Sequence, residues 1–390
     1  MVTVNLPLLK VPIVDYGEDE KEMVAYRDYG TQRALTLDNR GPIRFTHDGQ
    51  IDPQIIESYD RHGFYIFTDV IAAEELQDIE TDIADMLDRS PVAKDASTDR
   101  YGRPALGSGL SARNISWVKP LSDPIGGTDA SYGRHQVKMN EPVPPPQAPE
   151  YVVQLFLGSL QFSAACLRLY GHPQLLQIAE EINGPDFTPF NEAVWIKQPG
   201  LGGSVSWHQD GWTHWDSEHL DNHTHGFNFM AQLYGCDATN GLWVVPGSHR
   251  RGKIDIKQKI DEVGSDRLID AVPLICEPGD VAITSRQAIH GSFANTSSKT
   301  RVTINFGFHR RSSVLGVEGG GVHNPVSVYD DAYIFERSKA IAWGIDARSQ
   351  RYHRESRYVY QPFVGLEDDY RWSADTEKLL CDYNLRDIGI

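Results

Sequence analysis

The pattern of hydrophobic and polar positions divides the chain into a helical first part and a strand-rich middle. Apolar residues recur at three- and four-residue steps over residues 72–87, which predicts an amphipathic helix with an acidic outer face. Residues 53–62 have the same helical spacing and end at Gly63, a helix-stop signal. A short apolar strand is predicted over 64–68, and further helices are predicted over 151–182, interrupted at 171–173, and over 331–343.

Short apolar runs, separated by Gly, Pro and Asn turn signals, follow Gly184 and Pro185. They predict strands over residues 193–197, 204–209, 227–234, 241–245, 273–276, 280–284 and 301–308. Strands spaced in this way are typical of a β-sandwich or small barrel, here covered by the earlier helices. The expected fold class is therefore α+β, mainly β with flanking helices.

Three stretches lie outside this pattern. Residues 1–52 are polar and broken by Pro and Gly, which indicates an extended N-terminal arm with a short helix near 18–29, packed on the surface or on a neighbouring subunit. Residues 89–148 are rich in Gly and Pro, and a loop of this length is either a lid over a substrate site or a surface excursion. Residues 313–390 form an extension that we expect to pack on a core domain of residues 53–312.

Composition narrows the choice of partners and location. The chain has 390 residues and a formal net charge of −17, so its surface would repel nucleic acid and anionic membranes, and neither is an expected partner. A small-molecule substrate is expected, and homo-oligomer formation stays open. The four cysteines form no CxxC pair, which favours reduced thiols in a cytoplasmic protein. We expect neither a signal peptide nor a transmembrane helix.

The candidate chemistry begins at His208 and Asp210. On an extended strand, residues two apart point to the same face, so an imidazole and a carboxylate lie side by side. His290, just after an apolar strand, is the strongest candidate for a third ligand. His249 is its rival, but it lies in a Pro-Gly-Ser turn that it is expected to stabilise. Two histidines and one carboxylate occupy one face of Fe(II) and leave three positions open.

Arg301 follows eleven residues after His290 and opens a strand on which Arg301, Thr303 and Asn305 share one face. A buried guanidinium needs an anionic partner, and a dicarboxylic acid could accept two parallel hydrogen bonds from it. A 2-oxo acid could then chelate the iron through its keto and carboxylate oxygens, with its distal carboxylate on Arg301. Dioxygen (O2) would take the last iron position.

Taken together, these residues resemble the phytanoyl-CoA dioxygenase family of Fe(II)/2-oxoglutarate oxygenases. The similarity covers about residues 55–312, with its clearest stretches at 63–76, 197–210 and 240–249. It implies a double-stranded β-helix (jelly roll, cupin-like) core. The resemblance also implies that the iron ligands and catalytic residues are His208, Asp210 and His290. It implies further that Arg301 anchors 2-oxoglutarate and that Ser292 assists it. Further inward polar candidates near 2-oxoglutarate are Gln232 and Asn305.

The carboxylate ligand bears on the reaction. The family includes halogenases in which a small residue replaces the carboxylate so that chloride can bind, whereas Asp210 is present here. The expected reaction is therefore hydroxylation of a small organic molecule, with decarboxylation of 2-oxoglutarate to succinate and CO2. Desaturation or cyclisation by the same iron chemistry is the alternative. Candidate substrate contacts are Trp212, Trp215 and Trp117. The alternative for Trp212 and Trp215 is packing against the barrel rim, and for Trp117, in the loop 89–148, it is that the loop is a surface excursion.

Two other classes of protein share part of this pattern. A non-catalytic jelly-roll binding protein would keep the barrel but would not need the two histidines, the carboxylate and Arg301 together. A zinc hydrolase could use the three ligands, but it would have no use for Arg301 at that spacing and would usually need a general-base carboxylate beside the metal.

Overall fold

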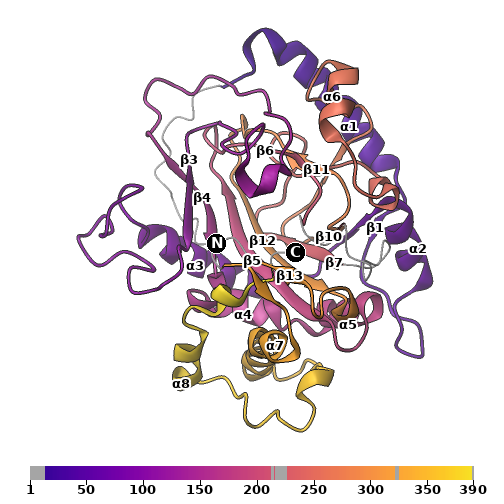
Figure 1. Ribbon diagram of the computed structural model, residues 1–390, viewed down its shortest axis with the longest axis vertical. Coiled ribbons are helices and arrows are strands. Elements are labelled where there is room, and N and C mark those ends of the chain that lie inside the picture. Colours follow the sequence, from indigo (N-terminus) through magenta and orange to yellow (C-terminus); the bar gives the residue numbers. More distant parts are fainter. Residues whose placement is uncertain (1–13, 212–214, 216–225, 321–324, 389–390) are drawn as a thin grey trace.

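The core of the molecule is a pair of β-sheets packed face to face, with helices around them (Figure 1). The computed structural model describes residues 14–211, 215, 226–320 and 325–388. The larger sheet has the strand order β1 (Arg40–Gly41), β2 (Phe64–Phe67), β10 (Val281–Ser285), β7 (Gly226–Gln232), β12 (Arg301–His309), β5 (Thr188–Lys197), β4 (Val152–Leu157) and β3 (Ile115–Val118). The smaller sheet has the order β6 (Val205–His208), β11 (His290–Ser292), β8 (Trp243–Val244) and β9 (Val272–Pro273). A separate ribbon pairs β13 (Glu318–Gly319) with β14 (Ser327–Val328).

Neighbouring strands of both sheets run antiparallel, except that β1 is parallel to β2. Apolar side chains fill part of the space between the sheets. Met230 and Ala282 of the larger sheet cluster with Val244 and Val272 of the smaller one. The predicted α+β fold class with a jelly-roll core is confirmed.

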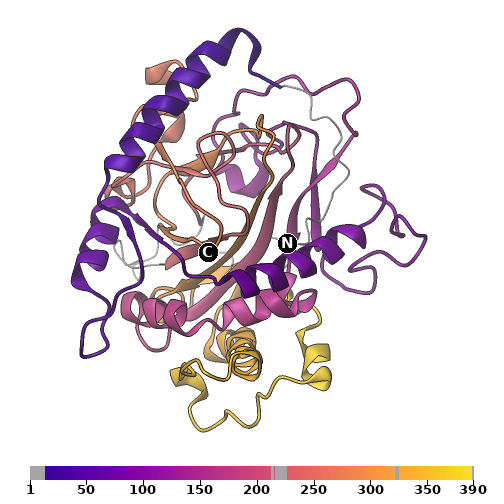
Figure 2. The ribbon, with the colours of Figure 1, turned by 180° about the vertical axis from the view of Figure 1, so that it is seen from behind.

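Helices cover the outer face of the larger sheet and one side of the smaller sheet (Figure 2). They are α1 (Glu20–Thr36), α2 (Pro53–His62), α3 (Ala73–Asp88), α4 (Ala164–Tyr170), α5 (Pro173–Asn183), α6 (Ile256–Val263), α7 (Asp331–Arg351) and α8 (Ala374–Glu377). None of the helices in the described part of the chain combines the length and the apolar character that a membrane crossing requires.

Strand β12 shows how the sequence sorts its side chains between the two faces. Val302, Ile304 and Phe306 pack with residues of α2 to α5 and α7 in the main hydrophobic core. Arg301 and Thr303 point the other way, to the inner face between the sheets, where their side chains contact each other. The alternation expected from the sequence therefore gives one apolar and one polar face.

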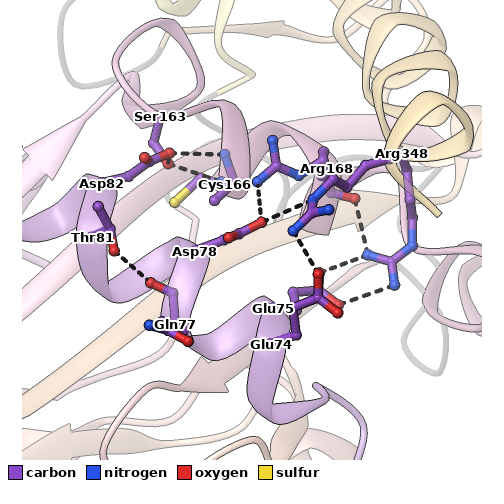
Figure 3. Close-up of polar contacts among 12 residues, drawn as sticks. Glu74, Glu75, Gln77, Asp78, Thr81, Asp82, Ser163, Cys166, Arg168 and Arg348 are labelled. Atoms are coloured by element: carbon purple, nitrogen blue, oxygen red, sulfur yellow. Dashed lines mark hydrogen bonds and ion pairs between the residues drawn. The ribbon is translucent and has the colours of Figure 1, made fainter. Parts of the chain in front are cut away.

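Charged side chains join the helical layer to the C-terminal extension (Figure 3). Arg348 of α7 donates two hydrogen bonds to the carboxylate of Glu75 in α3, and both side chains are almost fully buried. Arg168 of α4 pairs with Asp78 of α3 at 2.9 Å, and the exposed Arg351 pairs with Glu74 at 2.6 Å. Residues after 312 are thus tied to helices that precede the metal region.

Two predictions for the first half of the chain were wrong. Residues 152–157 form the strand β4 and not the start of a helix, although α4 and α5 do follow and are separated at Gly171 and His172 as expected. All six residues of β4 are buried, so their sequence has no alternating polar positions that would reveal a strand. Residues 115–118, expected to be part of an irregular loop, form the edge strand β3.

The N-terminal segment also differs from the expected extended arm. The short helix expected near 18–29 is the 17-residue helix α1, which packs on the smaller sheet with Tyr26 stacked on Trp243 at a ring-centroid distance of 4.6 Å. Gly30, which reads as a helix breaker, lies against the same tryptophan. An added Cβ there would be only 2.5 Å from the Trp243 ring, so the close packing of helix and sheet requires glycine.

Candidate metal centre

His208, Asp210 and His290 converge between the two sheets. His208 is the last residue of β6, Asp210 follows it two residues later, and His290 begins β11 directly opposite His208. One potential ligand atom from each lies within 4.8 Å of the others, and all three residues are buried. His290 was expected just beyond a strand, whereas it lies on a short strand of its own.

Backbone contacts orient both imidazole rings. The Nδ1 atom of His208 lies 2.8 Å from the carbonyl oxygen of Ser206, and that of His290 lies 2.9 Å from the carbonyl oxygen of Ala288. Because a carbonyl only accepts hydrogen bonds, Nδ1 carries the proton in each ring and Nε2 has its lone pair free. The Nε2 atoms face Asp210, at 3.5 Å from Oδ1 and 3.9 Å from Oδ2 respectively, as ligands to a shared metal ion would.

The carboxylate of Asp210 is held by its own neighbours. The side-chain amide of Asn228 on β7 donates a 2.9 Å hydrogen bond to Oδ2, and Arg286 Nε lies 3.7 Å from the same oxygen. Arg134 Nη1 lies 3.7 Å from the other oxygen, Oδ1. These contacts fix the carboxylate and leave Oδ1 closest to His208.

The protonation states suit metal binding. Burial lowers the pKa of His290 to about 4, with a further contribution from the charge of His208. Burial would raise the pKa of Asp210, but its hydrogen bond with His208 and the charges of His290 and Arg286 outweigh burial and hold that pKa well below its usual range. His290 is therefore neutral and Asp210 ionised near neutral pH, the forms that bind Fe(II). The residues thus fit the ion that the sequence implied.

A pair of buried cations lies on the facing sheet. Arg301 at the start of β12 is directly opposite Lys197 at the end of β5, and both are at most 5% exposed. Arg301 Nε donates to Thr303 Oγ1, and Thr303 Oγ1 in turn donates to Gln232 Oε1, each at 2.9 Å. Among the described residues, the polar contacts of these two side chains are with hydroxyl and carbonyl oxygens and not with carboxylates, although the charge of Asp123 acts on Lys197. A buried site with two basic side chains and no carboxylate in direct contact with them fits an anionic ligand such as a dianion.

Lys197 connects this cation pair to the metal-bearing sheet, and sequence reasoning missed it. Its Nζ donates to Ser292 Oγ at 2.8 Å and to the Phe293 carbonyl at 2.5 Å. Ser292 is two residues after His290, so the side chain of Lys197 ends near the triad of candidate metal ligands, His208, Asp210 and His290. Burial, with the charge of Arg301, holds the pKa of Lys197 well below its usual range. The only signal in the sequence was its place at the polar end of an apolar strand.

The other predicted site residues are more scattered. Gln232 joins the Arg301 network through Thr303, whereas Asn305 is half-buried on the inner face opposite Met230. Trp117 is partly buried and packs against the main core from the edge strand β3. Trp215 is half-buried, and Trp212 lies outside the described residues. His249, the rival ligand, points its Nε2 at the carbonyl of Asp60.

Part of the long loop closes on the triad. The His135 ring lies 4.2 Å from that of His208, and its Nδ1 is 3.0 Å from Ser206 Oγ. His135 is only 2% exposed, and Arg134 beside it approaches Asp210. The sequence suggested a lid here but could not indicate which of its residues reach the metal site.

Comparisons with known proteins agree with this geometry. Residues 150–303, which include all three candidate ligands, match the family Phytanoyl-CoA dioxygenase (PhyH). Phytanoyl-CoA dioxygenase 1 of Oryza sativa subsp. japonica is 32% identical over 118 residues, which cover 27% of this chain and 39% of the rice protein. The chain thus spans about two fifths of the length of that relative.

Two solved structures show a more distant similarity. EctD from S. alaskensis, with 2-oxoglutarate and 5-hydroxyectoine, is 17% identical with a TM-score of 0.48, covering 74% of this chain and 86% of that one. EvdMO1 is 20% identical with a TM-score of 0.45, covering 65% and 49%. The stretch of the chain that holds the His-Asp-His cluster, residues 150–303, is thus similar to the phytanoyl-CoA dioxygenase family.

Proposed function

We propose that this protein is a dioxygenase that hydroxylates a small organic molecule and converts 2-oxoglutarate to succinate and CO2. One observation carries the proposal. A three-residue metal site and a buried cation pair lie on facing sheets and are joined by the hydrogen bond from Lys197 to Ser292. A binding protein without catalysis would gain nothing from burying these charges together, because burying a charge without a partner is costly.

Each residue has a defined task in this proposal. When bound, Fe(II) would supply the activation of dioxygen coupled to oxidation of 2-oxoglutarate and substrate. His208 and His290 would hold it through Nε2, and Asp210 would add a negative charge. Lys197 and Arg301 would bind the distal carboxylate of 2-oxoglutarate, the arginine through parallel N–H groups that its contact with Thr303 orients.

The inner face of the larger sheet supports a substrate that is partly apolar. Trp195 on β5 lies directly opposite Thr303 and is half-buried, and it packs with the buried Leu155, Leu157 and Ala193. Asp210 fills the ligand position that a halide would need, which favours hydroxylation over halogenation. Desaturation and cyclisation would use the same residues, so the substrate selects among these outcomes.

Oxygen-dependent release of succinate tests the proposal. The purified chain with Fe(II), 2-oxoglutarate and a panel of small organic acids, terpenoids and alkaloids should release succinate in step with oxidation of one of them. His208→Ala and Asp210→Ala should fold normally but show no turnover. Full activity in either variant would refute the ligand assignment, and hydrolysis without oxygen consumption would favour a zinc hydrolase.

A further inference from the structure

Arg134 of the loop between α3 and β4 lies beside the metal-binding carboxylate, and the function proposed above gives it no task. Its Nη1 is 3.7 Å from Asp210 Oδ1, and its side chain is 27% exposed, more than that of Asp210 at 11%. Its Nε faces His135 Nε2 at 3.3 Å. Among the described residues the guanidinium makes no further polar contact, so it retains hydrogen-bond donors.

The loop holds this guanidinium in place. The backbone N–H of Gly127 donates a 2.8 Å hydrogen bond to the carbonyl of His135, which closes the loop around Arg134. His135 is in turn fixed by Ser206 and by the ring of His208. The buried His135 therefore fixes the backbone beside Arg134 and places the Arg134 side chain next to the triad.

Metal binding would change the charge balance around Arg134. Oδ1 of Asp210, the oxygen nearest Arg134, is also nearest to His208 Nε2, whereas Oδ2 is engaged by Asn228. A metal ion bound by His208 and Asp210 would neutralise part of the negative charge of the Asp210 carboxylate, which Arg134 now faces. Within the described ranges, Arg134 has no second acidic partner, and Arg286 adds a like charge on the other side of Asp210. The loaded site would thus have a cation in need of an anion.

Building on the iron site proposed above, we propose that Arg134 binds a carboxylate group beside the iron. The planar guanidinium fork matches the two oxygens of a carboxylate. Such a carboxylate has two sources, the one next to the keto group of 2-oxoglutarate or one on the substrate. In either case Arg134 selects the charge of what reaches the metal, in a protein whose overall charge of −17 would otherwise repel anions.

Acetate is a probe that needs no knowledge of the substrate. The protein is loaded with one equivalent of Mn(II), whose unpaired electrons relax nearby protons, and NMR relaxation of the acetate methyl group is measured against acetate concentration. The wild type should show saturable relaxation enhancement with acetate but not with uncharged acetamide. Arg134→Gln should weaken acetate binding roughly tenfold or more, as expected for loss of a charge-assisted hydrogen bond. Arg134→Lys should retain part of it.

Arg113→Gln is the matched control, because Arg113 lies in the same loop but is exposed. It should behave as the wild type does. Equal relaxation enhancement in the wild type and Arg134→Gln would overturn the proposal, because acetate would then be binding the metal or another site. Absence of enhancement in the Mn(II)-loaded wild type would overturn it as well.

Addition of 2-oxoglutarate separates the two sources. If Arg134 binds 2-oxoglutarate itself, saturating 2-oxoglutarate should abolish the acetate effect, and Arg134→Gln should weaken 2-oxoglutarate binding. If Arg134 serves the substrate, the acetate effect should persist and the 2-oxoglutarate affinity should not change. Both results support carboxylate binding. The visible band of the Fe(II)–2-oxoglutarate complex is measured separately and tests the proposed function. Loss of that band in the wild type would contradict the proposed function, whereas acetate binding that does not depend on Arg134 would contradict only the proposal for Arg134.

Discussion

Lys197 on β5 and Arg301 on β12 lie directly opposite each other, and both cationic side chains are buried on the inner face of the larger sheet. In such a place both basic groups lose their hydration, and the charge of Arg301 disfavours the protonated form of Lys197. The arrangement is understandable if a dianion binds between them. The two residues therefore test the proposed 2-oxoglutarate site more directly than the metal ligands do, because neither belongs to the candidate metal cluster.

Replacing Arg301 with Ala should weaken 2-oxoglutarate binding by roughly tenfold to a hundredfold, since a hydrogen-bonded ion pair is lost. Iron affinity should be nearly unchanged. Titration of the anaerobic Fe(II) protein with 2-oxoglutarate measures the first, and titration with Fe(II) alone measures the second. Arg311→Ala, just beyond the end of the same strand, is the control. Unchanged 2-oxoglutarate affinity in Arg301→Ala would remove Arg301 from the site.

Binding of 2-oxoglutarate should take up a proton at Lys197. Burial and Arg301 lower the pKa of this lysine in the free protein, whereas a bound dianion would raise it again. Between those two pKa values the complex binds one more proton than the free protein, so the dissociation constant of 2-oxoglutarate should decrease as the pH is lowered through that window. Calorimetry in buffers of different ionisation enthalpy measures the proton.

Lys197→Met should abolish this proton uptake, whereas Lys299→Met, which changes an exposed lysine, should retain it. Uptake of the same size in Lys197→Met would show that another group titrates.

Asn228→Ala should loosen the carboxylate ligand. The amide of Asn228 is the hydrogen-bond donor to Asp210 Oδ2, and loss of such a supporting contact typically lowers metal affinity by about tenfold to a hundredfold. Competition with a chelator of known Fe(II) affinity gives the value. Asn305→Ala should keep wild-type iron affinity. Asn305 also lies on the inner face, on β12, two residues before Gly307, which pairs with Asn228. Equal losses in both variants would mean that the effect is one of general stability.

The charged contacts between α3 and α7 should differ in their contribution to stability. Arg348→Ala leaves Glu75 buried without its partner and should lower the free energy of unfolding by about 3–5 kcal/mol. Arg351→Ala removes an exposed pair with Glu74 and should cost about 1 kcal/mol or less. Urea unfolding of both variants tests this. Similar losses would contradict the view that burial sets the value of these ion pairs.

The sequence predicted the chemistry better than the architecture that supports it. His208 and Asp210 were recognisable as a pair because residues two apart on an extended chain share a face. His290 and Arg301 were recognisable from their places at the ends of apolar strands and from the family resemblance. Strand β4 was not recognisable, because a strand buried on both faces lacks alternation. The length of helix α1 was underestimated because Gly30 reads as a helix breaker in the sequence. In the folded chain this glycine lies within the helix and allows its close contact with Trp243.

Residues brought to the site by register or by loop closure could not be predicted. Lys197 acquires its significance from pairing with Arg301 across two strands that are distant in the sequence. Asn228 reaches Asp210 from β7, and Arg134 and His135 reach the triad from a loop without regular structure. A single sequence contains no signal for such neighbours, because their proximity depends on tertiary packing.

Anaerobic addition of Fe(II) and 2-oxoglutarate to the metal-free protein tests the central claim most directly. A keto acid chelated to Fe(II) gives a weak visible charge-transfer band. The wild type should develop this band in a one-to-one ratio with iron, and Asp210→Ala should not. A folded, iron-loaded wild-type sample without the band would contradict the proposed 2-oxoglutarate site and favour a different metal or a binding role.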